Sequence, residues 1–226
     1  MFEQLTAALE RAEPIIDGRH PVPAEGMRKA AVLILLTNEA DPRLILTERA
    51  AHLRKHAGQV SFPGGSRDGQ ETPEQTALRE AMEECAIDAG GVRILGRLPA
   101  SSLPVTAFAV TPVVGVWDSA VPLEFVADPV EVADIHTVPV SALVDPANRG
   151  SWVLSGERAA AAARAEGGNP EVARQMRYTG PVFVYGEVVI WGFTAMLLDG
   201  FLELAGWAQP WDHNRIIEVP RRFRGR

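Results

Sequence analysis

Residues 71–85 of the chain read ETPEQTALREAMEEC, and this stretch predicts the helix around which the fold is organised. Two helix-start signals stand at its beginning. Thr72 and Gln75 have the spacing of a capping box, and Pro73 falls at the first helical position. We therefore expect a helix that runs from this point to about Ala86.

The two sides of the expected helix differ in chemistry. With about 100° of rotation per residue, the arc expected to be buried holds Ala77, Leu78, Ala81, Met82 and Cys85. The carboxylates on the other side are Glu80, Glu83 and Glu84. Like charges three or four residues apart destabilise a helix by roughly 0.2–0.5 kcal/mol per pair, so a purely solvated face would gain from lysines here.

Two explanations of this carboxylate cluster are compatible with the residues. One is a charged surface stripe with Arg79 as a local partner. The other is a site for Mg²⁺ or Mn²⁺, because the sequence FPGG at 62–65 predicts a tight glycine turn that brings backbone carbonyls close to the helix. Hard cations prefer such oxygen ligands, and a bound cation would relieve the repulsion between the glutamates. We favour the metal site.

The same residues resemble the Nudix box, G-x5-E-x7-R-E-U-x-E-E-x-G-U, where U is a bulky aliphatic residue. The matching positions are Gly65, Glu71, Arg79, Glu80, Glu83, Glu84 and Ile87. A match of this length at correct spacing is a highly specific signal. Ala81 departs by taking a place that is usually bulkier, and Ala86 replaces the terminal glycine. With alanine there, we expect the helix to end without a residue free to adopt the left-handed conformation.

The resemblance implies an α/β fold, a Nudix α/β/α sandwich with a mixed β-sheet and a catalytic helix. It also implies hydrolysis of a nucleoside diphosphate linked to another group. The implied metal ligands are Glu80, Glu83, Glu84 and the carbonyl of Gly64. Arg79 would then orient the carboxylates, although a plain helix salt bridge explains it equally well. We prefer Glu80 as general base over Glu131, which stands at the start of a later strand, where some Nudix enzymes place an additional ligand or base. A solvated residue at a strand edge explains Glu131 equally well.

A second stretch, residues 45–65, resembles the signature of coenzyme A pyrophosphatases, L-L-T-x-R-[SA]-x3-R-x3-G-x3-F-P-G-G. The matching positions are Thr47, Arg49, Ala50, Arg54, Gly58, Phe62, Pro63, Gly64 and Gly65, and Ile45 replaces the first leucine. The resemblance implies that Arg49, Arg54 and Phe62 contact substrate. The arginines can bond phosphate oxygens. The alternative is that Arg49 ends an edge strand and Arg54 is a solvated loop charge.

We therefore expect hydrolysis of coenzyme A or its thioesters to 3′,5′-ADP and a 4′-phosphopantetheine product, with Mg²⁺ or Mn²⁺. The main alternative is another substrate, such as ADP-ribose, NADH or a nucleoside triphosphate. A third interpretation is a Nudix-fold binding module without turnover, for which loss of a box carboxylate would be the sign, and none is lost. The sequence distinguishes neither free from acylated coenzyme A nor a monomer from a homodimer.

Composition limits the remaining possibilities. The 226 residues are 46% hydrophobic and 23% charged, which is typical of an ordinary globular protein. A net charge of −7 argues against nucleic acid and anionic membranes as partners. The one cysteine, Cys85, excludes an internal disulfide, and the longest apolar runs are too short to span a membrane. Because the N-terminus is acidic where a signal peptide would be basic, we expect a cytoplasmic protein.

The chain divides into three expected parts. These are an N-terminal helix and linker at 1–27, a Nudix domain at 28–206 with an alanine-rich insertion near 155–180, and a tail at 207–226. The strand-like runs are 28–37, 43–49, 58–62, 91–100, 108–118, 131–140 and 180–192, and a last apolar helix is expected at 193–207. The insertion is a lid, an oligomer contact or a surface excursion.

Overall fold

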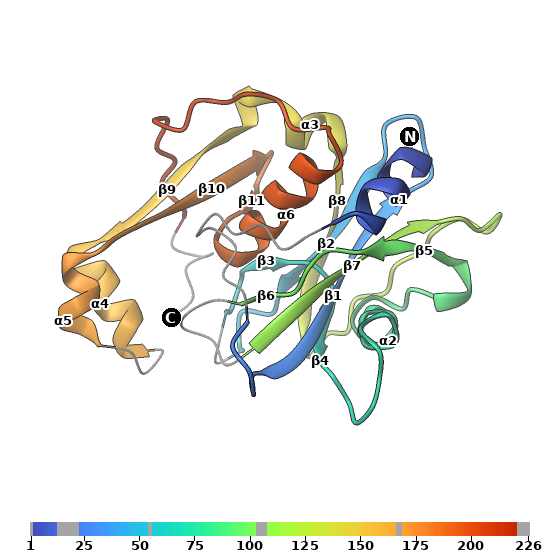
Figure 1. Cartoon of the computed structure of the whole chain (residues 1–226), viewed down its shortest axis with the longest axis horizontal. Coiled ribbons are helices and arrows are strands. Elements are labelled where there is room, and N and C mark those ends of the chain that lie inside the picture. The colour runs from blue at the N-terminus through green and yellow to red at the C-terminus, as the bar shows by residue number, and fades with distance from the viewer. Residues whose placement is uncertain (1, 13–22, 54–55, 103–107, 166–168, 221–226) are drawn as a thin grey trace.

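The computed structural model describes residues 2–12, 23–53, 56–102, 108–165 and 169–220. Within these ranges the chain forms two β-sheets with helices packed around them (Figure 1). Most of the expected linker lies outside the described residues, because residues 13–22 are not among them. No helix in the described part of the chain is long and apolar enough to cross a membrane.

The larger sheet is mixed. Its strands are β1 (Arg28–Thr37), β2 (Arg43–Arg49), β3 (Val60–Ser61), β4 (Gly64–Ser66), β5 (Val92–Arg97), β6 (Ser101–Ser102), β7 (Phe108–Trp117) and β8 (Val132–Pro139). Their order among the described residues is β3-β2-β1-β7-β5, with β4 beside β1, β6 beside β7 and β8 beside β2. β1 and β7 run parallel, whereas the other paired strands are antiparallel. The mixed sheet expected from the sequence is confirmed.

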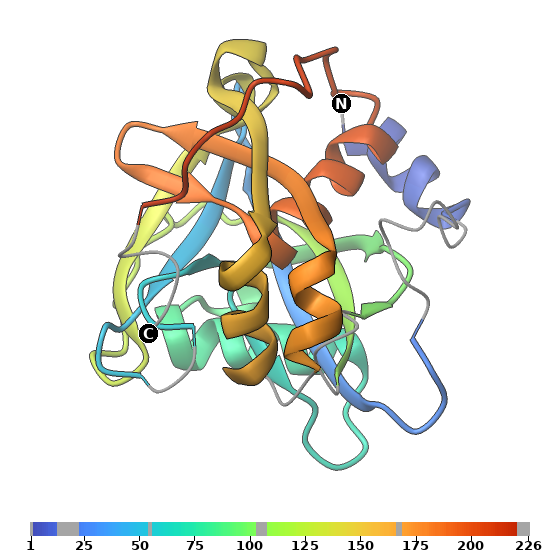
Figure 2. The same cartoon turned by 90° about the vertical axis from the view of Figure 1, so that its left-hand side faces the viewer.

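The smaller sheet is antiparallel, and the sequence pattern does not predict it as a separate sheet. Its strands are β9 (Arg149–Ser155), β10 (Arg177–Tyr185) and β11 (Val188–Ile190), in the order β11-β10-β9. Helices α4 (Gly156–Ala165) and α5 (Pro170–Gln175) lie side by side at the far end of β9 and β10 (Figure 2). We call β9, α4, α5 and β10 the arm. It extends away from the larger sheet, so the alanine-rich insertion forms the end of the arm (Figure 1).

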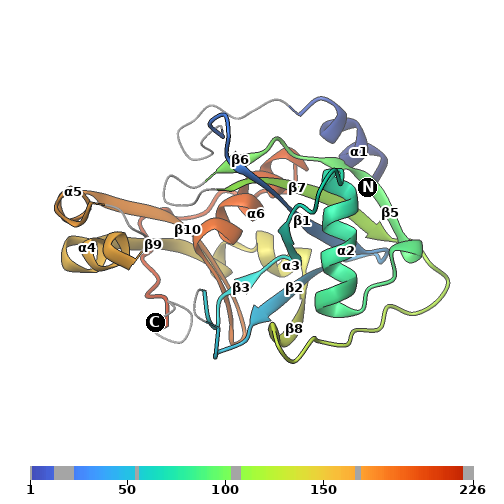
Figure 3. The ribbon, with the colours of Figure 1, turned by 90° about the horizontal axis from the view of Figure 1, so that it is seen from below.

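Helices cover both faces of the larger sheet. They are α1 (Phe2–Glu10), α2 (Pro73–Cys85) and α6 (Gly192–Leu204), with α3 (Val140–Val144), η1 (Ala89–Gly91) and η2 (Pro146–Asn148) in connections. Alternate residues of a strand point to opposite faces. Leu33 and Leu35 of β1 pack in the cluster that includes α2, whereas Ile34 and Leu36 pack in the cluster that includes α1 and α6. Figure 3 shows α2 across the sheet, and the expected α/β/α sandwich is confirmed.

The sequence pattern does not predict strand β9, because this strand begins with a buried charged residue. The side chain of Arg149 is 1% exposed and forms an ion pair with Asp199 of α6. Its guanidinium lies over the rings of Phe183, at 4.5 Å, and Trp211, at 4.6 Å. A strand that starts with arginine and glycine has no apolar alternation to detect, and only the tertiary partners explain its burial.

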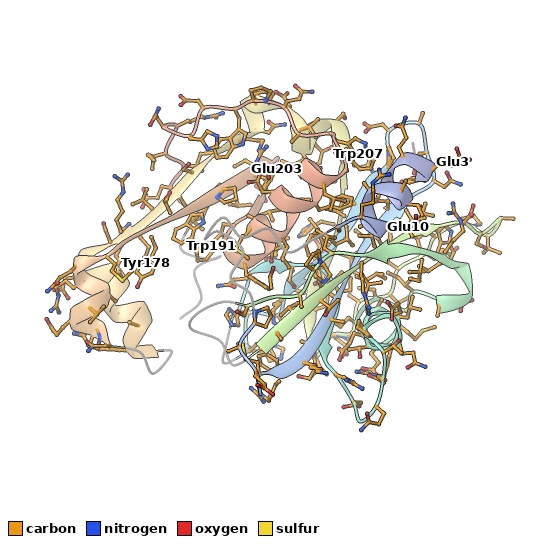
Figure 4. All side chains as sticks on the ribbon, in the orientation of Figure 1. Glu3, Glu10, Tyr178, Trp191, Glu203 and Trp207 are labelled. Atoms are coloured by element: carbon orange, nitrogen blue, oxygen red, sulfur yellow. The ribbon has the colours of Figure 1, made fainter. Side chains whose placement is uncertain are left out.

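The chain after α6 turns back to the smaller sheet. Trp207 packs edge-on against Phe201 at 5.7 Å, and Figure 4 shows it at the end of α6 that lies beside α1. Farther on, the amide of Ser151 donates to the carbonyl of Arg215 at 2.8 Å, and the amide of Ile217 donates to the carbonyl of Ser151 at 2.9 Å. The segment around residue 216 therefore lies along the edge of β9.

Candidate active site

Helix α2 begins as the sequence predicts and ends differently. The amide of Gln75 donates to Thr72 Oγ1 at 3.3 Å, and the amide of Thr72 donates to Gln75 Oε1 at 2.8 Å, so the capping box is confirmed. At the other end, Ala86 adopts the left-handed conformation with φ of 57°. The expectation that alanine would avoid this conformation is wrong. The cost is about 1–2 kcal/mol, and the amide of Ala86 donates to Met82 O at 2.9 Å in return.

The two glycines before the helix form a strand rather than the tight turn expected from the sequence. Gly64 and Gly65 are extended and pair with β1 as part of β4. A Cβ on Gly64 would lie 2.4 Å from the carbonyl oxygen of Ala31, and one on Gly65 would lie 2.4 Å from Glu80 Oε1. Both positions therefore require glycine: Gly64 because it lies against the backbone of β1, and Gly65 because it lies against the carboxylate of Glu80 in α2.

Arg79 is the centre of a hydrogen-bonded network on the exposed side of α2. Its Nη1 donates to Glu80 Oε1 at 2.9 Å and to Glu83 Oε2 at 3.0 Å. Its Nε donates to Glu71 Oε1 at 2.9 Å, and its Nη2 donates to the carbonyl of Ser66 at 3.0 Å. These contacts raise the pKa of Arg79, and its guanidinium lowers the pKa of Glu71 to about 2. One guanidinium thus orients three box carboxylates.

Glu84 is buried, which the helical pattern does not predict. It is 4% exposed, whereas Met82, expected on the buried arc, is 44% exposed. The amide of Gly64 donates to Glu84 Oε2 at 3.1 Å, and Arg49 Nη1 lies 3.7 Å from Glu84 Oε1. The segment before β8 closes the same side, where the amide of Asp128 donates to the carbonyl of Glu84 at 3.0 Å. Packing of β4 and this segment against α2 therefore shifts the buried arc toward Glu84.

The charges around Glu84 act on its protonation. Burial raises the pKa of Glu84 to about 7, while the Gly64 amide and the Arg49 guanidinium oppose this rise. Burial also raises the pKa of Glu80, and Arg79 opposes that rise. The negative charge of Glu131 contributes to both increases, so its carboxylate belongs to the same electrostatic cluster.

The other four residues singled out from the sequence lie in different situations. Arg49 ends β2 beside Glu84. Phe62 is 3% exposed and packs in the apolar cluster on the α6 side of the sheet, so the structure does not bring it to the carboxylates. Arg54 lies outside the described residues. Glu131 immediately precedes β8, and its carbonyl accepts a hydrogen bond from the amide of Ala50 at 2.8 Å.

The carboxylates at this site have the chemistry that a hard divalent cation prefers, but in the described residues they do not have the spacing of a complete set of ligands. The carboxylates of Glu80, Glu83, Glu84 and Glu131 supply only oxygen, which Mg²⁺ and Mn²⁺ prefer. The buried, raised-pKa carboxylate of Glu84 is the kind of group that a cation would stabilise in its charged form. Within the described ranges, no three acidic, histidine or cysteine side chains already stand close enough together to hold an ion. Glu80 and Glu83 instead share Arg79, as described above.

A mixed sheet between helices, with a carboxylate-bearing helix over a glycine strand, defines an α/β protein with an acidic site. The chain matches the NUDIX domain family over residues 27–155, more than half of its length, and it belongs to that family.

Two curated relatives show where the likeness lies. The chain is 48% identical over 115 residues to a protein of Citrobacter koseri described as uncharacterized Nudix hydrolase NudL, covering 50% of this chain and 58% of the relative. A protein of the same description from Yersinia pestis is 47% identical over 115 residues, covering 50% of this chain and 56% of the relative. The chain therefore spans less than two thirds of the length of these relatives. A solved Nudix hydrolase of M. smegmatis, RenU, is 26% identical with a TM-score of 0.41, covering 53% of this chain and 74% of that one.

Proposed function

We propose that the protein hydrolyses the diphosphate bond of coenzyme A or its thioesters, giving 3′,5′-ADP and 4′-phosphopantetheine or its acyl form. The observation that carries the proposal is the meeting of Glu84, from the Nudix helix, with Arg49, from the second signature, at 3.7 Å. The two sequence signatures thus share one site. A carboxylate that suits a cation and a guanidinium that suits a phosphate lie side by side in it.

In this proposal Glu80, Glu83, Glu84 and the carbonyl of Gly64 hold Mg²⁺ or Mn²⁺. When bound, the cation would neutralise phosphate charge and lower the pKa of a coordinated water. Arg79 orients Glu80 and Glu83 through its Nη1 hydrogen bonds and opposes the rise in the pKa of Glu80 that burial causes. Arg49 offers a guanidinium, 27% exposed at its side chain, to an anionic group of the substrate.

The general base is proposed to be Glu80, with Glu131 as the alternative. Both carboxylates belong to the electrostatic cluster around Glu84, so position alone does not separate them. We expect Glu80→Gln to reduce kcat at saturating metal more than Glu131→Gln does, because Glu80 is fixed by Arg79 and faces Gly65. The measurement is kcat for each variant across a metal titration. A larger loss in Glu131→Gln would make Glu131 the base.

The substrate assignment is tested by the arginines. A charge-assisted hydrogen bond to phosphate is worth roughly 1.5–3 kcal/mol, so Arg49→Ala and Arg54→Ala should each lower kcat/KM by about tenfold to a hundredfold. If either arginine binds the 3′-phosphate, its replacement should lower kcat/KM for coenzyme A more than kcat/KM for 3′-dephospho-coenzyme A. If both arginines bind the diphosphate, each replacement should lower kcat/KM by the same factor for the two substrates.

The experiment compares kcat/KM for coenzyme A, 3′-dephospho-coenzyme A, ADP-ribose and NADH in the wild type and both variants. Arg177→Ala is the matched control, because Arg177 is an exposed arginine at the start of β10 in the arm. It should change none of the four values by more than about twofold. A wild type that turns over ADP-ribose or NADH far faster than coenzyme A would overturn the substrate assignment and leave the Nudix chemistry in place.

A further inference from the structure

The pairing of β2 with β8 changes register beside the candidate active site. The ladder is regular from Arg43↔Pro139 to Glu48↔Asp134, and the next pair is Arg49↔Val132, so the register shifts between Glu48 and Arg49. A shift of this kind is a β-bulge, which bends a strand and re-aims its side chains. Here the extra residue is Ala133 of β8, and the shift lies opposite the step from Glu48 to Arg49, whose guanidinium lies beside Glu84.

The face of the sheet opposite α2 carries an acidic pair at the same point. Glu48 and Asp134 are direct cross-strand neighbours, and like charges in that position repel each other. His136 lies between them: its Nε2 is 3.1 Å from Glu48 Oε2, and its Nδ1 is 3.8 Å from Asp134 Oδ2. Because a carboxylate only accepts hydrogen bonds, Nε2 is the donor to Glu48.

These two arrangements are coupled through the backbone. Glu48 and Arg49 are consecutive residues of one strand, so their side chains leave opposite faces of the sheet. The following amide, that of Ala50, donates to the carbonyl of Glu131 at 2.8 Å and ties the strand end to the segment that carries Glu131. Any displacement of Glu48 away from Asp134 would therefore move both Arg49 and Glu131 relative to α2.

We infer that His136 is a positioning residue for the proposed reaction, because its hydrogen bond to Glu48, which lies opposite Asp134, holds the strand end that presents Arg49 and Glu131 to Glu84. The inference rests on the proposed function. His136 lies opposite Leu46, on the α6 side of the sheet, so it acts through the strands and touches neither substrate nor the carboxylates of α2. A displacement of about 1 Å in an active site can lower the rate a hundredfold.

The test compares four proteins with coenzyme A as substrate: His136→Ala, His136→Gln, Glu48→Gln and the double variant His136→Ala/Glu48→Gln. We expect His136→Ala to lower kcat/KM by about tenfold, since Glu48 then loses the hydrogen bond from His136 that holds it beside Asp134 against their mutual repulsion. His136→Gln should keep most of the activity, because its amide can still donate to Glu48. The double variant should also recover, because it no longer has a charge at position 48.

A second readout is hydrogen exchange at the Ala50 amide, which should quicken in His136→Ala and return toward the wild-type rate in the double variant. If His136 merely filled space, adding Glu48→Gln to His136→Ala would restore neither kcat/KM nor the exchange rate of the Ala50 amide. Normal kcat/KM in His136→Ala, or a double variant as impaired as the single one, would overturn the inference while the proposed function stands. A wild type inactive on every diphosphate would instead overturn the proposed function, and the inference with it.

Discussion

Glu84→Gln should reduce kcat for coenzyme A hydrolysis by roughly a hundredfold to a thousandfold while the fold survives. Glutamine keeps the size and helix propensity of glutamate, and its side-chain oxygen can still accept the hydrogen bond from the Gly64 amide. What is lost is the negative charge that the proposed cation needs. The measurement is kcat at saturating Mg²⁺ or Mn²⁺, with circular dichroism and thermal unfolding to show that the variant is folded.

Glu74→Gln provides the matched control for this prediction. Glu74 lies in the first turn of the same helix, and its carboxylate is 3.7 Å from Arg97 Nη1, away from the box carboxylates. Its replacement should leave kcat within about twofold of the wild type, since a partly exposed ion pair contributes little. A well-folded Glu84→Gln protein with near-normal kcat would refute the proposed metal site.

Arg149→Met should lower the free energy of unfolding by about 3–5 kcal/mol, the usual effect of removing one partner of a buried ion pair. Methionine replaces much of the stem volume but leaves Asp199 without the guanidinium that balances its charge. The contacts of that guanidinium with the rings of Phe183 and Trp211 are lost as well. At roughly 2–4 °C per kcal/mol for a chain of this size, Tm should fall by about 6–20 °C.

Urea unfolding of Arg149→Met and of a control, Arg177→Met, measures this effect. Arg177 is exposed, so its replacement should change the free energy of unfolding by no more than about 0.5 kcal/mol. A loss below about 1 kcal/mol in Arg149→Met would mean that the burial of this pair is balanced by its own desolvation, and that β9 is held by its other contacts.

The sequence predicts most closely those elements whose signals are local. β1 and β2 occupy the residues expected from the sequence, because each is a continuous apolar run and the turn signal between them marks where the first ends and the second begins. The start of α2 is equally well determined, since Thr72 and Gln75 satisfy each other within one turn. The metal and substrate roles of the box residues remain predictions.

The features that the sequence does not predict depend on contacts between distant segments. Glu84 is buried because the Gly64 amide and Arg49 meet it from other elements, and a helical pattern sorts residues only by polarity. The sequence around Gly64 and Gly65 predicts a turn. In the structure both glycines belong to a strand, where Gly64 packs closely against β1 and Gly65 packs closely against Glu80. Strand β9 is also not predicted, because it begins with Arg149, and the partner that allows this arginine to be buried, Asp199, lies far away in the sequence, in α6.

The segment at the end of the arm starts and ends at neighbouring positions of the smaller sheet, which affects how its length can vary. Ser155 and Arg177 are paired neighbours in the β9–β10 ladder, so residues 156–176 leave and re-enter the sheet at adjacent points. Closing a connection twice as long costs only about 0.6 kcal/mol of additional chain entropy. A change in the length of this segment therefore costs little chain entropy, although it would also alter the packing of α4 and α5, where Ala160 and Ala173 are buried.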